Sequence, residues 1–373
     1  MGIAPPDQRH QATKRNPPKI RQPYPGALDH AVRLIHTVCC LAGVPSLIDD
    51  MRRDLRSEKV LAGIKKGDSA VVFDWLMAAL SYQGISDQVA YDYMAAHGRA
   101  TWRELAANLA ASASCPKLAS YWHFHDCRYE KSSRTCTQPD HINDCPLPCH
   151  DLRNGHLNQL AYSLFLFIRD LVDDDLVGWI DRQLKAANDP PGLDRLARMR
   201  ASLIDPLSEV YGVSDKVLTM ALSSLLIGAP KSMDLWIEVG GSMIAIDTLV
   251  HNFLHRSGIL HRFKAQHSYG AACYRPGGCA EIIQSAAERI DVRQFNPAFP
   301  QCFPRFVQHA IWRYCSQNGL DICNGNHIDD ERRCRNVACR MRLMCHRVAL
   351  WETRRSKRRI AKSKKIVSVI SSA

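Results

Sequence analysis

The sequence has 373 residues, of which 46% are hydrophobic and 23% are charged, and its formal net charge is +12 at pH 7. This length fits two or three domains or one helical body in two lobes, and the composition is that of a globular protein rather than a disordered or fibrous one. The longest apolar runs, near 160–168 and 217–229, are shorter than the roughly 20 residues that cross a bilayer, and the N-terminus lacks the pattern of a secretory signal. We therefore expect neither a membrane protein nor a secreted one.

The excess of positive charge lies at the two ends of the sequence. Residues 1–25 hold five Lys or Arg and one Asp, and residues 351–373 hold eight Lys or Arg and one Glu, so the part between them is nearly neutral. Basic tails on a neutral body indicate a polyanionic partner, with nucleic acid first, although a solvated tail without a partner is the alternative. Residues 1–25 are also rich in Pro, Gln and Arg, which predicts a disordered tail.

Helical patterns begin near residue 27. Apolar residues recur every three or four positions from Ala31 to Ala42, which predicts one amphipathic helix. The same reasoning predicts further helices over 71–80, 88–96, 101–113, 158–171, 176–187, 193–208, 217–227, 248–257, 280–290 and 304–317. Strand-like alternation is scarce throughout, so the predicted fold class is all-α.

Residues 115–156 interrupt this helical pattern. They are poor in periodic apolar residues and rich in Cys, His, Pro and Asn, which predicts an irregular insert. The tightest set of potential ligands is Cys145, Cys149 and His150, but no standard zinc spacing is met. We expect buried, inert thiols here rather than a zinc site.

Two segments carry features that phosphate binding and acid–base chemistry require. Residues 203–222 read as two helices joined by a short turn that contains Gly212, and backbone N–H groups at the start of the second helix can bind a phosphate. Asp247 comes directly before the helix predicted over 248–257. Each feature also has an ordinary interpretation, because helix corners with Gly are common and Asp is a favoured N-cap residue.

Three segments together resemble the helix-hairpin-helix (HhH-GPD) DNA glycosylases, and within them the endonuclease III group. Residues 80–83 (LSYQ) match a helix end of the form Leu-Ser-x-Gln, residues 212–216 (GVSDK) resemble the hairpin Gly-Val-Gly-x-Lys, and residues 246–250 (IDTLV) resemble Val-Asp-Thr-x-Val. The segments occur in the order that the family shows. Ser214 replaces the second hairpin glycine, and Tyr211 stands where proline is usual.

The resemblance implies a two-lobed, all-α glycosylase fold. The implied division of the chain is a lobe of residues 26–64 and 255–350 with a C-terminal four-cysteine loop, a lobe of residues 65–254 with the hairpin and the 115–156 insert, and the tails 1–25 and 351–373. The stretch from Lys216 to Asp247 is longer than in endonuclease III, so a loop or an extra turn is expected around 229–241.

The function that the resemblance implies is base excision from DNA. Breaking the bond between C1′ and the base gives the sugar oxocarbenium character, and the carboxylate of Asp247 would stabilise that charge. The amine of Lys216 would attack C1′ and form a Schiff base, which permits strand cleavage by β-elimination, so the enzyme would be a DNA glycosylase with AP-lyase activity. Oxidised pyrimidines, mismatched bases, 8-oxoguanine and modified cytosines all remain open as the target.

The resemblance also assigns residues that contact DNA. A base inside a duplex must be flipped out before it can react, and Gln83 would fill the gap that it leaves. The backbone N–H groups of Gly212, Val213 and Ser214 would hold a phosphate of the bent strand, which positions the protein without reading sequence. The implied partner is double-stranded DNA, bound by a monomer in the bacterial cytoplasm, at the nucleoid, or in the nucleus of a eukaryote.

Four cysteines near the end of the chain can hold a metal centre. Cys323, Cys334, Cys339 and Cys345 lie within 23 residues, and four thiolates suit zinc or an iron–sulfur cluster. The resemblance favours a [4Fe–4S] cluster, which many endonuclease III relatives carry after the catalytic domain, although the spacing here differs from theirs. Zinc and unliganded thiols are the alternatives. The arginines between these cysteines suit a DNA backbone or a solvated face.

Two other functions fit the same sequence features. One is a non-catalytic DNA-binding protein on a glycosylase fold, and the other is a metal-stabilised helical regulator that binds nucleic acid through its basic tails. Catalysis requires the side chains of Lys216 and Asp247 to converge on one nucleotide, and this requirement separates the enzyme from the other two.

Overall fold

The helices of the chain form two groups, and each group has its own hydrophobic core. The computed structural model describes residues 22–350, except 83–86, 112–114, 126, 128, 131–134, 137–144, 146, 148–155, 190 and 193. The regular secondary structure of the described residues is helical apart from one short antiparallel hairpin in the insert, β1 (Tyr129–Glu130) with β2 (Thr135–Cys136), which confirms the predicted all-α class. The two predicted tails lie outside the described residues, apart from residues 22–25.

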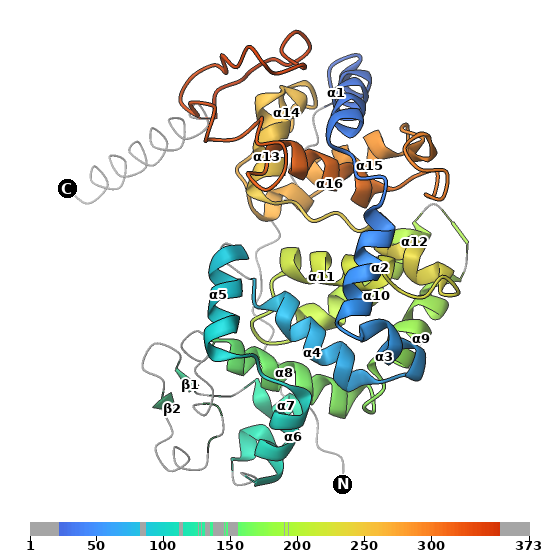
Figure 1. Cartoon of the computed structure of the whole chain (residues 1–373), viewed down its shortest axis with the longest axis vertical. Coiled ribbons are helices and arrows are strands. Elements are labelled where there is room, and N and C mark those ends of the chain that lie inside the picture. Colours follow the sequence, from blue (N-terminus) through green and yellow to red (C-terminus); the bar gives the residue numbers. More distant parts are fainter. Residues whose placement is uncertain are drawn as a thin grey trace, which may run out of the picture.

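The first group, called the terminal lobe below, joins the N-terminal helix to the C-terminal part of the chain. Its elements are α1 (Ala27–Ala42), α13 (Thr248–Arg256), α14 (Ile259–Arg262), η4 (Ala271–Tyr274), α15 (Cys279–Ala287), η5 (Val292–Gln294) and α16 (Pro304–Cys315). The apolar stripe of α1, including Leu34, Ile35 and Val38, is fully buried, and α1 packs against α15 and α16. Figure 1 shows these helices gathered at the top of the molecule, beside the long C-terminal loop.

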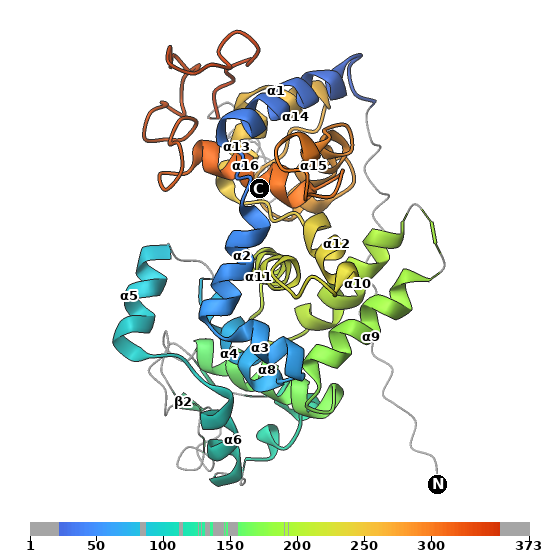
Figure 2. The same cartoon turned by 45° about the vertical axis from the view of Figure 1, so that its right-hand side comes forward.

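The second group, called the central lobe, contains the helices between them. Its elements are α2 (Leu47–Ser57), α3 (Val60–Lys66), α4 (Ser69–Leu80), α5 (Asp87–His97), α6 (Trp102–Ala111), η1 (Pro116–Leu118), α7 (Tyr121–Phe124), α8 (His156–Leu171), α9 (Leu176–Asn188), α10 (Arg195–Ser208), α11 (Asp215–Ile227) and α12 (Asp234–Ser242). The apolar helix α11 lies at its centre and packs against α2, α4, α10 and α12 (Figure 2). A helix that is apolar on most sides requires such burial.

The two cores meet along α2 and at the end of α12. Leu47 belongs to the terminal core and Leu55 to the central one, while Met243 and Ile244 mark the second change from one core to the other. Among the described residues, no single helix is both long and apolar enough to cross a bilayer, and one bent pair, α1 with α2 at 53°, meets the length and composition of a span.

The sequence pattern does not predict α2, α3 or α12, and α12 occupies most of the place where a loop or extra turn is expected. A Cβ atom on Gly240 would lie only 2.7 Å from Cβ of Leu226 in α11. Gly240 therefore allows α11 and α12 to approach closely, and Gly241 leaves room for the ring of Phe303, although two adjacent glycines usually indicate a helix end. Helix α2 is difficult to recognise because it buries only Leu47 and Leu55 among many charged residues.

The described parts of the insert pack against the start of α8. The buried amide Asn158 Nδ2 donates to the Leu147 carbonyl at 2.6 Å, and Gln159 Nε2 donates to the Tyr129 carbonyl at 3.0 Å. Burial raises the pKa of the Cys145 thiol to about 11, as expected for an inert thiol. Cys149 and His150, the other members of the tightest predicted set, lie outside the described residues.

Helix α16 carries a titratable group that remains neutral in the fold. His309 stacks on Trp312, with ring centroids 5.6 Å apart. Burial lowers the pKa of His309 to about 3, the positive charges of Arg305 and Arg313 act in the same direction, and Asp50 opposes them. The imidazole is therefore uncharged in the folded protein at neutral pH.

Candidate active site

A tight turn joins α10 to α11, as the sequence predicts. Gly212 in this turn has a φ of 79°, a left-handed conformation that glycine adopts without strain. The Val213 N–H donates to the Val210 carbonyl at 3.2 Å, and the Tyr211 N–H donates to the Ser163 hydroxyl of α8 at 2.9 Å. These bonds fix the turn on the central lobe.

The turn leads directly into the first residues of α11. Ser214 is the N-cap residue and is exposed, and Lys216 in the first turn is partly buried. The first N–H groups of a helix lack intrahelical partners and lie at the positive end of its dipole. The backbone of Gly212, Val213 and Ser214 thus precedes a helix start that can accept an anion.

Asp247 is the N-cap residue of α13, which agrees with the ordinary interpretation of its sequence position. Its Oδ1 accepts the Val250 N–H at 2.8 Å. The four residues before it, 243–246, are buried, so the chain crosses the junction of the two lobes and then presents Asp247 at a partly exposed helix start. Lys216 stands on the central-lobe side of this junction.

The electrostatic surroundings of Asp247 include Lys216. Burial raises the pKa of the Asp247 carboxyl above its usual value. The N–H groups of Val250 and Leu249 act against this rise in pKa, and so do the positive charges of Lys216 and Arg305. The structure therefore brings Lys216 close enough to act on the carboxyl of Asp247, although the two residues lie far apart in the sequence.

Two tyrosines beside Asp247 are not predicted from the sequence. The Tyr274 hydroxyl accepts the Ile246 N–H at 2.9 Å, and the Tyr269 hydroxyl lies 3.5 Å from the Ile246 carbonyl oxygen, to which it donates. Burial raises the pKa of the Tyr269 phenol, and the nearby charge of Asp247 raises it further. Both rings keep exposed surface, so they form part of the wall of the site.

A buried arginine is also missing from the sequence prediction. Arg305 on α16 is 6% exposed, and its Nη1 donates to Oε1 of Gln308. Burial lowers the pKa of Arg305 to about 10, while the charge of Asp247 acts in the opposite direction. The periodicity of α16 gives no signal for this residue, because a buried arginine interrupts an otherwise amphipathic pattern.

A group of potential metal ligands joins α13 to the chain that follows α14. Ligand atoms of His251, His267, Cys273 and Cys279 all lie within 4.8 Å of one another, and no other such group of three or more is found among the described residues. His251 Nδ1 is 3.4 Å from the Cys279 sulfur and 3.5 Å from the Cys273 sulfur, and His267 Nε2 is 3.3 Å from the Cys279 sulfur. This group can bind a metal ion, and the sequence prediction missed it because its spacing follows no standard pattern.

The four C-terminal cysteines approach one another more loosely. Burial raises the pKa of the Cys345 thiol to about 12, and neighbouring Cys323, Cys339 and Cys334 raise it further. Their sulfur atoms do not form a group as tight as the ligand atoms of His251, His267, Cys273 and Cys279.

Basic clefts lie along the C-terminal loop. One cleft of about 800 Å³ is lined by His30, Arg262, Arg333, Arg342, Leu343, Met344, Cys345, His346 and Arg347. A second cleft of about 550 Å³ includes Arg332, Arg333 and Arg335. Several guanidinium groups around one cleft favour the binding of phosphate groups.

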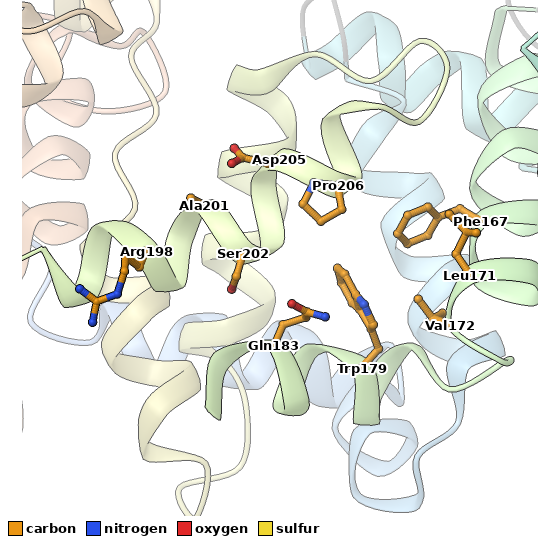
Figure 3. Close-up of a pocket in the computed structure, with 10 residues that line it drawn as sticks. All are labelled: Phe167, Leu171, Val172, Trp179, Gln183, Arg198, Ala201, Ser202, Asp205 and Pro206. Atoms are coloured by element: carbon orange, nitrogen blue, oxygen red, sulfur yellow. The ribbon is translucent and has the colours of Figure 1, made fainter. Parts of the chain in front are cut away.

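A separate cavity of about 540 Å³ lies between α8, α9 and α10. Figure 3 shows Phe167 and Trp179 on one side of it and Ser202, Asp205 and Pro206 on α10. Its lining contains neither Lys216 nor Asp247, so this cavity is distinct from the candidate active site.

The motif of the form Leu-Ser-x-Gln begins at Leu80, the last residue of α4. Ser81 is buried after the last helical residue, Leu80, and its hydroxyl donates to the Ala78 carbonyl at 2.6 Å. Gln83, the predicted wedge, lies outside the described residues.

Comparisons of the chain with family models, with curated proteins and with solved structures each found no match. The family expectation therefore depends on the three motifs and on the geometry described above.

Proposed function

We propose that this protein is a DNA glycosylase of the helix-hairpin-helix type with AP-lyase activity. The observation that supports this most directly is that the positive charge of Lys216 acts on the Asp247 carboxyl and opposes the rise in its pKa. Each residue stands at the start of a helix, one on each side of the junction between the lobes. A glycosylase needs an amine and a carboxylate beside one anomeric carbon, and we assign these two roles to Lys216 and Asp247.

In the proposed reaction, the bond between C1′ and the base breaks and its electron pair leaves with the base. The carboxylate of Asp247 stabilises the positive charge that develops on the sugar. The Nζ atom of Lys216 attacks C1′ and loses a proton, and ring opening gives a Schiff base. Loss of the proton at C2′ then expels the 3′ phosphate by β-elimination. Arg305 acts as a positioning residue whose charge favours the ionised form of Asp247.

Contacts with the DNA backbone come from two regions in this proposal. The backbone at Gly212 and Ser214 and the start of α11 hold one phosphate near the flipped nucleotide, whereas the Val213 N–H donates to the Val210 carbonyl and fixes the turn. The arginine-lined cleft that contains Arg333 and Arg342 attracts further phosphates of the duplex. Gln83 retains its proposed role as the wedge that replaces the flipped base.

The C-terminal cysteines have a structural role in this proposal. Cys323, Cys334, Cys339 and Cys345 would hold a [4Fe–4S] cluster, which would supply a covalent anchor for the basic loop. The loop is also tied to α13, because the buried guanidinium of Arg256 pairs with Asp330 and donates to the Cys323 carbonyl at 3.2 Å.

Borohydride trapping tests the proposal without knowledge of the target base. The full chain is incubated with a duplex that contains an abasic site, and borohydride reduces any Schiff base to a stable adduct between protein and DNA. The unsubstituted protein and Lys231→Ala, which removes an exposed lysine elsewhere on the central lobe, should form the adduct, and Lys216→Ala should not. DNA binding without any adduct would instead favour the non-catalytic DNA-binding protein, and an adduct in Lys216→Ala would refute the role of this lysine.

A further inference from the structure

The segment between α14 and α15 contacts Ile246, which directly precedes Asp247 of the candidate active site. It runs from Phe263 to Gly278, contains only the short 3-10 turn η4, and carries both Tyr269 and Tyr274. Irregular segments of this length need strong local contacts to keep one conformation. The contacts here are concentrated at four side chains that share one small volume: His251 on α13, His267 in the segment, Cys273 in η4 and Cys279 at the start of α15.

The distances among these side chains match a single tetrahedral metal ion. Zinc bonds of about 2.3 Å to sulfur and about 2.05 Å to nitrogen, at tetrahedral angles, place sulfur and nitrogen about 3.6 Å apart. The three distances between nitrogen and sulfur given above are 3.3, 3.4 and 3.5 Å. Because all four ligand atoms lie within 4.8 Å of one another, the site has room for one ion rather than for a cluster.

The surroundings of the four side chains fit a structural zinc site. The two cysteines are fully buried, His251 is 5% exposed and His267 is partly exposed, and four protein ligands complete the tetrahedral shell of a structural zinc site. His267 Nδ1 lies 2.6 Å from the Ala265 carbonyl oxygen, which leaves Nε2 free to bind a metal. A ligating histidine usually has such an outer partner on its second nitrogen. Two nitrogen and two sulfur donors in tetrahedral geometry favour zinc.

We propose that His251, His267, Cys273 and Cys279 bind one Zn²⁺ ion, which fastens residues 263–279 to α13 and thereby holds the wall of the site at Asp247. Ligand binding through Cys273 fixes the neighbouring Tyr274, whose hydroxyl accepts the Ile246 N–H at 2.9 Å. Ile246 directly precedes Asp247. The zinc ion is thus a positioning element for the acid, and its presence does not depend on whether the protein excises bases.

Metal analysis of variants tests the site. The full chain, produced with zinc and iron in the medium, should contain about one zinc ion per chain in addition to any iron. Cys273→Ser should lose the zinc, and so should His267→Ala, which changes a less buried ligand and is therefore the safer variant for folding. Cys302→Ser, which changes an exposed cysteine of the same lobe, should keep it.

The assignment is overturned if the unsubstituted protein lacks zinc, or if Cys273→Ser and His267→Ala both keep it. Loss of zinc in Cys339→Ser but not in Cys273→Ser would place the ion at the C-terminal cysteines and would also overturn it. In the unsubstituted protein, Co²⁺ in place of zinc should give the visible spectrum of a tetrahedral ion with thiolate ligands. An octahedral spectrum would contradict the proposed ligand set.

Limited trypsin digestion tests the positioning role without DNA. Lys264, which is followed by Ala265, is an exposed cleavage site within the fastened segment, whereas the bond after Arg275 leads into Pro276 and resists trypsin. Removal of the metal by a chelator should accelerate cleavage at Lys264, and added zinc should restore the original rate. Equal cleavage with and without zinc would show that the ion does not hold this segment, even if the metal is bound. Because no base excision is measured, this result is independent of the proposed glycosylase activity.

Discussion

Substitutions of Asp247 can separate its role as a helix cap from its role in catalysis. Oδ1 of Asp247 accepts the Val250 N–H at 2.8 Å. Alanine removes this bond and should lower the free energy of unfolding by about 1 kcal/mol, the usual contribution of an N-cap side chain. Asparagine keeps an acceptor at the same position, so Asp247→Asn should remain within about 0.5 kcal/mol of the unsubstituted protein. Urea unfolding followed by circular dichroism measures both values.

The chemical role should respond in a different way to the same two substitutions. Asparagine carries no charge and cannot stabilise a developing oxocarbenium ion, so Asp247→Asn should lose base release by about 100-fold or more. The assay is strand scission by alkali after incubation with a panel of duplexes that carry damaged, mismatched or modified bases. Asp68 offers a matched control, because it caps α4 in the same way, at 3.1 Å from the Ala70 nitrogen and 3.3 Å from the Val71 nitrogen.

Asp68→Asn and Asp68→Ala should reproduce the stability pattern without a change in base release. Base release at the normal rate by Asp247→Asn would refute the catalytic role of the carboxylate. If Asp247→Asn destabilises the protein as much as Asp247→Ala, the reasoning about the cap is wrong as well.

Two further predictions concern acid stability and DNA affinity. Burial lowers the pKa of His309 to about 3 in the folded protein, whereas the same imidazole in the unfolded chain keeps a pKa of about 6.5. Between these two pH values the unfolded chain binds a proton that the folded protein does not, so the free energy of unfolding falls as the pH falls through this range. At about pH 5 the imidazole accounts for a loss of about 2 kcal/mol, which His309→Gln should abolish in urea unfolding; an equal acid sensitivity of the two proteins would contradict this. Arg333→Gln combined with Arg342→Gln should weaken DNA binding and lower the slope of log affinity against log salt by about 2, as measured by fluorescence anisotropy. Arg182→Gln, on the exposed face of α9, should leave the slope unchanged, and an unchanged slope in the double variant would exclude its two arginines as phosphate contacts.

The sequence predicts those parts of the fold in which one segment contains the whole signal. The stripe from Ala31 to Ala42 forms α1, and Asp247 begins α13 where an N-cap residue is expected. Helix α12 was missed because Gly240 and Gly241 indicate a break when they are considered alone. The role of Gly240 becomes visible only when Leu226 of α11 is packed against it, and that of Gly241 only when the distant Phe303 lies beside it.

The residues of the candidate site are also difficult to predict, because they come from separate segments of the chain. The joint role of Lys216 and Asp247 is predicted only through the resemblance to a family pattern, and periodicity alone gives no reason for it. The ligands of the proposed zinc site lie on three elements, α13, η4 and α15, and in the irregular segment after α14, and the first two ligands are separated by a helix and a loop. Arg305 is hidden for a different reason, because sequence patterns predict that arginine is exposed unless its partners are known.

Helix α13 connects three features that lie apart in the sequence. Asp247 caps its first turn, His251 projects from its middle, and Arg256 at its last residue pairs with Asp330 of the C-terminal loop, 74 positions away. Nine residues of α-helix form a strut about 14 Å long that resists bending. A displacement of the loop at Arg256 would therefore act on the same stiff element whose other end carries the carboxylate of Asp247.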